Sequence, residues 1–143
     1  MLVPKSSLDP VQILCLDGDG IGPEITAATR RVLQAVDDCF DLNLTFTTQD
    51  IGFVSLAASG TTFPDKVLDA AKAADGIVMG PVSTIDYPPA SEGGINPSGF
   101  LRRQLDLYAN IRPAQSYDGL PPRVGDRVAV SYTHLTLPTI YSV

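Results

Sequence analysis

Apolar and polar residues follow one another along the first half of the chain in a pattern that predicts alternating strands and helices. Residues 11–16 (VQILCL) form a short apolar run that predicts a buried strand. Pro23 then stands where a first helical residue belongs, and Glu24 places negative charge on the first turn, where the helix dipole favours it. The apolar positions that follow recur at helical spacing, at Ile25, Ala28, Val32 and Val36. We therefore expect a helix that continues to Val36 and packs this face against the strand.

The next elements continue this alternation. Residues 42–47 (LNLTFT) alternate between apolar and polar side chains, which predicts a half-buried strand. Residues 51–62 are rich in small side chains and predict a loop with room for a short helix. A second helix is expected over residues 63–74, and residues 77–79 (IVM) predict a further strand. The order β-α-β-α-β is typical of an α/β fold, in which helices flank a sheet.

The last third of the chain is dominated by loops. Residues 80–99 carry glycines and prolines that preclude regular structure over most of their length, and loops this long in compact domains are usually functional or disordered. A third helix is expected over residues 100–105, and an extended segment over residues 106–113. After the proline-rich connection 117–126, residues 127–129 begin another predicted strand.

The composition and net charge exclude several classes of protein. With 143 residues, 44% of them hydrophobic and 18% charged, the chain has the composition of one soluble globular domain. The net charge of −6 argues against nucleic acid or an anionic membrane as a partner. The sequence shows neither a secretory signal nor an apolar run long enough to span a bilayer. Cys15 and Cys39 lack the spacing of a disulfide framework or metal site, so we expect a cytoplasmic protein with reduced thiols.

A glycine-rich turn joins the first strand to the first helix. A strand, a glycine turn and a helix N-terminus together make a suitable place for a phosphate or a carboxylate. The spacing of Gly18, Gly20 and Gly22 does not fit a Rossmann fingerprint, because the third glycine comes one residue early and is followed by Pro23. On the glycine pattern alone, a purely structural turn is the preferred interpretation.

Two arginines are the first candidates for binding chemistry. Arg112 interrupts an otherwise apolar strand, and a buried guanidinium needs an anionic partner. Arg102 follows the glycine-rich loop at the start of a predicted helix; alternatively, Arg102 and Arg103 form a solvated helix face. Guanidinium groups bind carboxylates through two parallel hydrogen bonds, each worth about 1.5–3 kcal/mol when charge-assisted. Two converging arginines would therefore hold a dicarboxylate.

Three stretches of the chain resemble one known family. The string LDGDGIGPEI, the element ADGIVMG and the stretch FLRRQLDLYANIRPAQSY are similar to motifs of the isocitrate and isopropylmalate dehydrogenases, the β-decarboxylating dehydrogenases. The resemblance covers about residues 11–129. It implies the N-terminal part of the isopropylmalate dehydrogenase-like α/β fold, which binds NAD or NADP without a Rossmann domain, in truncated form.

The resemblance implies roles for five residues. Arg102 and Arg112 match arginines that grip the malate portion of the substrate. Ile21 matches a position that packs beside the cofactor, and Ser83 lies in a turn that borders the nicotinamide; simple packing is the alternative for both. Ser98 stands where isopropylmalate dehydrogenases tend to have a leucine for the isopropyl group, which favours a polar substituent, as in isocitrate, tartrate or D-malate. Alternatively, Ser98 is only the N-cap of the helix.

The chemistry implied by the resemblance is oxidative decarboxylation of a 2-hydroxy acid with NAD or NADP and Mg²⁺ or Mn²⁺, in a homodimer. The metal-binding aspartates, the catalytic tyrosine and the lysine have no matching positions in this chain, so we expect neither catalytic nor metal-binding residues here. Two alternatives stay open. The parent protein is a non-catalytic regulatory subunit of the same family, or the chain is a small α/β anion-binding module.

The last fourteen residues differ in character from the rest. Residues 130–143 (VSYTHLTLPTIYSV) contain no Asp, Glu, Lys or Arg and resemble a translated sequencing adaptor. We therefore expect one domain over residues 1–129, followed by a non-native tail; a threonine-rich edge strand is the alternative. Because such a chain would leave strand edges unpaired, we also expect it to be unstable and inactive by itself.

Overall fold

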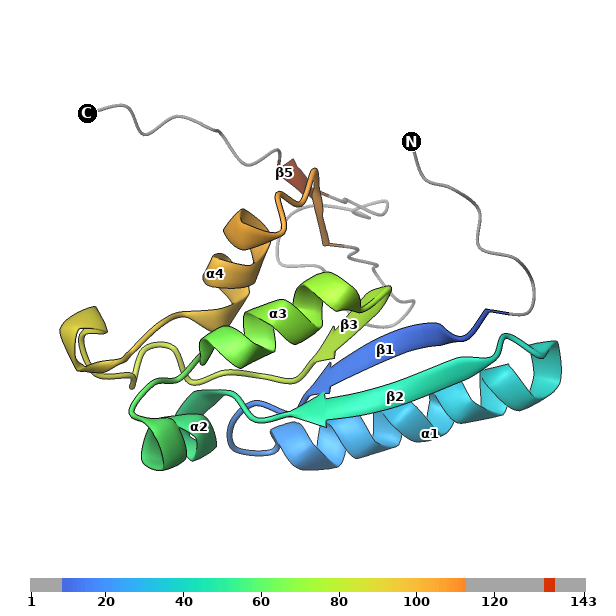
Figure 1. The fold of residues 1–143 in the computed structure, drawn as a ribbon, viewed down its shortest axis with the longest axis horizontal. Helices are drawn as coiled ribbons and strands as arrows, with labels where there is room; N and C mark the ends of the chain where they lie inside the picture. Colours follow the sequence, from blue (N-terminus) through green and yellow to red (C-terminus); the bar gives the residue numbers. More distant parts are fainter. Residues whose placement is uncertain (1–8, 113–132, 136–143) are drawn as a thin grey trace, which may run out of the picture. The chain divides into compact units, whose positions relative to one another are not determined.

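A computed structural model describes residues 9–112 and 133–135 of the chain (Figure 1). The chain divides into two compact units. The first ends at Leu105 and the second begins at Asp106. In order, the elements of the first unit are β1 (Val11–Leu16), α1 (Gly22–Phe40), β2 (Leu44–Gln49), α2 (Gly52–Ser59), α3 (Asp65–Ala73), β3 (Gly76–Met79), the short 3₁₀ helix η1 (Ala90–Glu92) and α4 (Pro97–Gln104). Within the described ranges, every helix is too short or too polar to cross a membrane.

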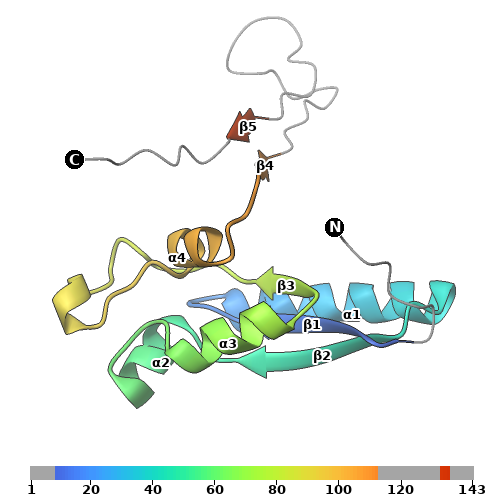
Figure 2. The same cartoon turned by 45° about the horizontal axis from the view of Figure 1, so that its top comes forward.

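The sheet of the first unit is parallel, with the strand order β2-β1-β3. Ile13 of the central strand pairs with Phe46 of β2 on one side and with Gly76 of β3 on the other. The crossover from β1 to β2 and the crossover from β2 to β3 run in opposite directions. Since such crossovers are right-handed, their helices cover opposite faces of the sheet. Figure 2 shows α1 behind the strands and α3 in front of them, which confirms the predicted α/β architecture.

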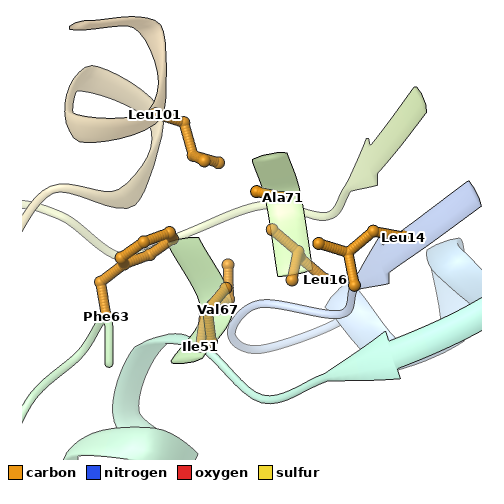
Figure 3. Close-up of a cluster of buried hydrophobic side chains, with 7 residues drawn as sticks. All are labelled: Leu14, Leu16, Ile51, Phe63, Val67, Ala71 and Leu101. Atoms are coloured by element: carbon orange, nitrogen blue, oxygen red, sulfur yellow. The ribbon is translucent and has the colours of Figure 1, made fainter. Parts of the chain in front are cut away.

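The hydrophobic core lies on the α3 side of β1 (Figure 3). Its fully or nearly buried side chains come from β1, α3, α4 and the segments that flank α2: Leu14, Leu16, Ile51, Phe63, Val67, Ala71 and Leu101. Leu101 brings α4 into this core, and the rings of Phe63 and Phe100 pack with their centroids 5.2 Å apart. Cys15, the neighbour of Leu14 on β1, is also fully buried, whereas Cys39 near the end of α1 is exposed.

The helix α1 has the predicted start but turns a different face to the sheet. Gly22 and Thr26 are its buried residues, whereas Ile25, Ala28 and Val32 are exposed, so the prediction that these three pack on the strand is wrong. The cause is a backbone contact, because a Cβ at Gly22 would overlap the carbonyl oxygen of Asp17. This contact fixes the rotation of the helix, and the position one turn later, Thr26, therefore faces the sheet.

The start of α4 also corrects a prediction. The helix begins at Pro97, three residues earlier than expected, because Asn96 is its N-cap and Pro97 its first residue. The side-chain oxygen of Asn96 accepts a hydrogen bond from the Gly99 N–H at 3.1 Å. The alternative interpretation of Ser98 as the N-cap is therefore wrong. The short helix for which the 51–62 loop had room is present as α2.

The second unit contains a two-stranded antiparallel sheet. Strand β4 (Asn110–Arg112) pairs with β5 (Thr133–Leu135), with Ile111 opposite His134. Strand β4 confirms part of the extended segment predicted over residues 106–113. The predicted connection 117–126 and strand 127–129 lie outside the described residues, and the assignment of residues 130–143 to a non-native tail stays a prediction.

One buried hydroxyl fixes the far end of the long loop between β3 and α4. Thr62 has no solvent exposure. Its Oγ1 accepts a hydrogen bond from the Ile95 N–H at 2.7 Å and donates to the Ile95 carbonyl, also at 2.7 Å. Its backbone N–H donates to the Gly93 carbonyl at 2.9 Å. The loop returns to the core at this point, just before α4 begins.

We expect Thr62→Val to lower the free energy of unfolding by about 2 kcal/mol, because the replacement keeps the shape but removes the buried hydroxyl that pairs with both the N–H and the carbonyl of Ile95. Urea denaturation of the purified chain measures this difference. Thr47→Val, at an exposed position of β2, is the matched control and should change stability by less than about 0.5 kcal/mol. Equal losses in the two variants would contradict the anchoring role of Thr62.

Candidate functional site

The candidate site lies at the carboxyl ends of the three parallel strands, which is the edge where open α/β sheets bind ligands. The loop 17–21 leaves β1 there, α2 begins three residues after the end of β2, and the loop 80–89 leaves β3. Three segments that are distant in sequence therefore meet at one edge.

Glycines allow two of these segments to touch through their backbones. Gly18 has a positive φ of 77°, and a Cβ there would overlap the carbonyl oxygen of Pro81. A Cβ at Gly80 would overlap the carbonyl oxygen of Asp17. The Asp19 N–H donates to the Pro81 carbonyl at 2.8 Å and closes the contact. The glycine-rich turn thus allows the loops that follow β1 and β3 to come into backbone contact.

The Asp19 carboxylate joins all three segments. Only 7% of Asp19 is exposed. Its Oδ1 accepts a hydrogen bond from the Phe53 N–H of α2 at 2.7 Å, and its Oδ2 accepts from the Ser83 N–H at 3.0 Å and from the Tyr87 hydroxyl. The rings of Phe53 and Tyr87 pack edge to face, with centroids 5.1 Å apart. We call the Asp19 carboxylate and its donors on Phe53, Ser83 and Tyr87 the Asp19 junction.

The junction stabilises the charged form of Asp19. Burial by itself raises the pKa of this carboxyl, but the hydrogen bonds from Tyr87, Ser83 and Phe53 outweigh burial and hold the pKa below its usual value of 3.8. Burial and the hydrogen bond to the Asp19 carboxylate raise the pKa of the Tyr87 phenol. At neutral pH the tyrosine is therefore the donor and the carboxylate the acceptor. The first turn of α2 adds the positive end of its dipole.

The two predicted cofactor residues, Ile21 and Ser83, lie on the loops that follow β1 and β3, and these loops are in contact. Ile21 immediately precedes α1 and is 62% exposed, so its side chain offers apolar surface at the edge of the sheet. Ser83 is half-buried, and its backbone N–H is held by Asp19. The hydrogen bond between Asp19 and Pro81 joins the two loops.

The predicted substrate residues are brought together only in part. Arg102 and Ser98 lie one turn apart on α4, and the Arg102 Nε donates to the Ser98 carbonyl at 3.0 Å. Arg102 is half-buried, whereas Arg103 is exposed. Arg112 ends β4 in the second unit, and its side chain lies outside what the structure describes. The convergence of Arg102 and Arg112 therefore stays a prediction.

Sequence reasoning did not single out Asp19 or Tyr87. The sequence offered one signal for Asp19, an acidic residue between two glycines in a turn where few side chains fit. Tyr87 lies 68 residues further along the chain, in a loop without periodic structure, so no local pattern links it to Asp19. Among residues 9–112 and 133–135, no group of three or more His, Cys, Asp or Glu side chains is placed to hold a metal ion.

Comparison with known proteins shows one consistent similarity. The profile of the family described as isocitrate/isopropylmalate dehydrogenase matches residues 12–127. A protein of Hahella chejuensis named 3-isopropylmalate dehydrogenase is 42% identical over 114 residues, which cover 76% of this chain and 31% of that relative. The chain thus spans about a third of the length of the curated relatives it matches.

Solved structures show the same similarity at the level of the fold. The crystal structure of isocitrate dehydrogenase from Methylococcus capsulatus aligns with a TM-score of 0.67 and 32% identity, covering 88% of this chain and 35% of that one. The crystal structure of a β-decarboxylating dehydrogenase from Thermococcus kodakarensis has a TM-score of 0.62 at 24% identity, covering 89% of this chain and 41% of that one.

We expect Asp19→Asn to lower the free energy of unfolding by about 2–3 kcal/mol at neutral pH, because the amide removes the charge at a buried residue and turns a donor toward the N–H of Phe53 or of Ser83. Urea denaturation measures this loss. Asp86→Asn removes one negative charge from an exposed position of the loop that carries Ser83 and should have an effect below about 0.5 kcal/mol.

The loss should depend on pH in a defined direction. A carboxyl whose pKa is lower in the folded chain stabilises the fold above its ordinary pKa and loses this effect as the pH falls through the lowered value. The difference between the parent chain and Asp19→Asn should therefore be constant near neutrality and shrink below about pH 4. A difference that does not change between pH 7 and pH 3 would rule out a charged Asp19 as its source.

Proposed function

The chain belongs to the isocitrate/isopropylmalate dehydrogenase family, as its motifs predicted, and on that premise we propose that its parent protein oxidatively decarboxylates a 2-hydroxy acid with NAD or NADP. This chain contributes part of the cofactor edge and part of the substrate site. The observation that carries the proposal is the contact between the loops of Ile21 and Ser83 at the carboxyl ends of β1 and β3.

On the cofactor side, the two loops would border the nicotinamide. The exposed Ile21 side chain gives the ring an apolar surface and excludes water from one side. The Ser83 hydroxyl, on a backbone held by Asp19, is the polar group of this edge. When bound, the nicotinamide accepts the hydride that leaves the hydroxyl-bearing carbon of the substrate.

On the substrate side, Arg102 and Arg112 would each bind a carboxylate. The hydrogen bond from the Arg102 Nε to the Ser98 carbonyl fixes the guanidinium before substrate arrives, so less side-chain entropy is lost on binding. Ser98 would face the substituent that distinguishes one hydroxy acid from another. A hydroxyl there favours a polar substituent, as in isocitrate, tartrate or D-malate, over an isopropyl group.

The family reaction also uses Mg²⁺ or Mn²⁺ in a homodimer. In the described part of the chain, no group of three or more His, Cys, Asp or Glu side chains is placed to hold such an ion. The metal and the proton-transferring side chains would come from the part of the parent protein that corresponds to the rest of the curated relatives.

A chimera tests the proposal. The matching 114-residue segment of the Hahella chejuensis relative is replaced by the corresponding segment of this chain, and turnover is measured with isopropylmalate, isocitrate, tartrate and D-malate, each with NAD⁺ and NADP⁺. We expect turnover with a preference for one of the three polar substrates. A preference for isopropylmalate would refute the role of Ser98. A folded chimera that binds hydroxy acids without turning any over would favour the regulatory subunit.

In the same chimera, we expect Arg102→Lys to raise the KM for the hydroxy acid about 10- to 100-fold, which corresponds to the loss of a charge-assisted hydrogen bond of about 1.5–3 kcal/mol. Lys keeps the charge but lacks the planar fork. Arg103→Lys, at the exposed neighbouring position, is the matched control and should leave the KM unchanged. Equal effects in the two variants would place Arg102 on a solvated helix face.

A further inference from the structure

The loop between β3 and α4 is held to the rest of the first unit at three places. At its start, the Gly80 N–H donates to the Leu16 carbonyl at 2.8 Å, and the Pro81 carbonyl accepts from Asp19. At its end, Gly93 and Ile95 are bonded to Thr62. Between these places, Ser83 and Tyr87 are held by the Asp19 carboxylate.

We propose that Asp19 is a positioning residue of the cofactor edge: its carboxylate holds Ser83 and the first turn of α2 against the loop of Ile21 before any dinucleotide binds. The inference rests on the proposed function, because it assigns Asp19 a role toward the ligand of that site. Asp19 as a residue is only 7% exposed, and so its carboxylate acts through Ser83 and Ile21 rather than through direct contact with the cofactor.

Three features of the junction support this role. Its donors lie 34, 64 and 68 residues from Asp19, so one side chain directly links segments that the pairing of β1 with β2 and β3 brings to the same edge. Asp19 itself is only two residues from Ile21, and the backbone between them is fixed by a hydrogen bond from the Gly22 N–H to the Asp19 carbonyl at 2.9 Å. Ser83 is both a donor to Asp19 and a predicted cofactor residue.

Packing around the carboxylate excludes other arrangements of these segments. Gly52 has a positive φ of 74°, and a Cβ there would overlap the Asp19 side chain. The first residue of α2 thus lies directly against the carboxylate. The edge-to-face contact of Phe53 and Tyr87 connects two of the three donor residues to each other. Replacing the carboxylate by an amide would leave one of the part-buried N–H groups of Phe53 and Ser83 without its acceptor, and movement of the loop that carries Ser83 would relieve this.

The test uses the chimera described under the proposed function, its Asp19→Asn and Tyr87→Phe variants, and Asp86→Asn as the control that removes the same charge from an exposed position of the loop that carries Ser83 and Tyr87. Nuclear magnetic resonance measures two quantities in each protein. The first is the hydrogen-exchange protection of the Phe53, Ser83 and Ile95 amides. The second is the Kd for NAD⁺ and for NADP⁺, from the shifts of the Ile21 methyl signals.

We expect Asp19→Asn to lower the protection of the Phe53 and Ser83 amides at least tenfold, to leave Ile95 protected by Thr62, and to weaken dinucleotide binding at least tenfold. Tyr87→Phe keeps both backbone hydrogen bonds and should weaken binding about threefold, so the proposal can be tested even if Asp19→Asn does not fold. Asp86→Asn should match the unsubstituted chimera in both measurements.

Unchanged binding in Asp19→Asn would overturn the inference, and so would weakened binding with both amides still protected. If Asp19→Asn does not fold, unchanged binding in Tyr87→Phe overturns it. These results differ from a failure of the proposed function, in which the unsubstituted chimera with intact amide protection shows no shift of Ile21 with either dinucleotide. In that case the positioning role is refuted as well, since no cofactor is bound for Asp19 to position.

Discussion

The arrangement of the candidate site depends on one buried negative charge and the hydrogen bonds that compensate it. A carboxylate taken out of water is costly unless donors replace its hydration, and Asp19 receives them from the segments that follow β2 and β3. The dependence is mutual. The carboxylate needs these N–H and O–H groups to stay charged, and the two segments that carry them need the carboxylate as their acceptor.

Backbone contacts bring the loops around this charge close together. The glycines of the turn after β1 let two loops approach until one backbone touches the other, and the same crowding at Gly22 determines which face α1 turns to the sheet. A single local constraint therefore has two outcomes. It places the Ile21 loop beside the Ser83 loop, and it leaves Ile25 and Val32 of α1 facing solvent in the part of the chain that the structure describes.

Local patterns predicted the elements better than the contacts between them. The strands β1 and β3 and the helix α3 follow from apolar runs and spacing, and their order gave the α/β class. The face of α1 was predicted wrongly, because periodicity counts apolar side chains, whereas Gly22 acts through the side chain it lacks. The start of α4 was missed because Asn96 and Pro97 signal a cap by their order rather than by hydrophobicity. The Asp19–Tyr87 contact joins residues too distant in sequence for any periodic signal.

The two cysteines of the chain also allow the opening of the sheet to be measured, because one is buried on the central strand and the other is exposed. Cys15 is fully buried on β1, and burial raises the pKa of its thiol, so little reactive thiolate forms there in the folded chain. Cys39 near the end of α1 is exposed. An alkylating reagent will therefore reach Cys39 in the folded chain, but will reach Cys15 only when the strands separate. The extent of alkylation at Cys15 relative to Cys39 therefore reports how often the sheet opens, without a tag or an introduced residue.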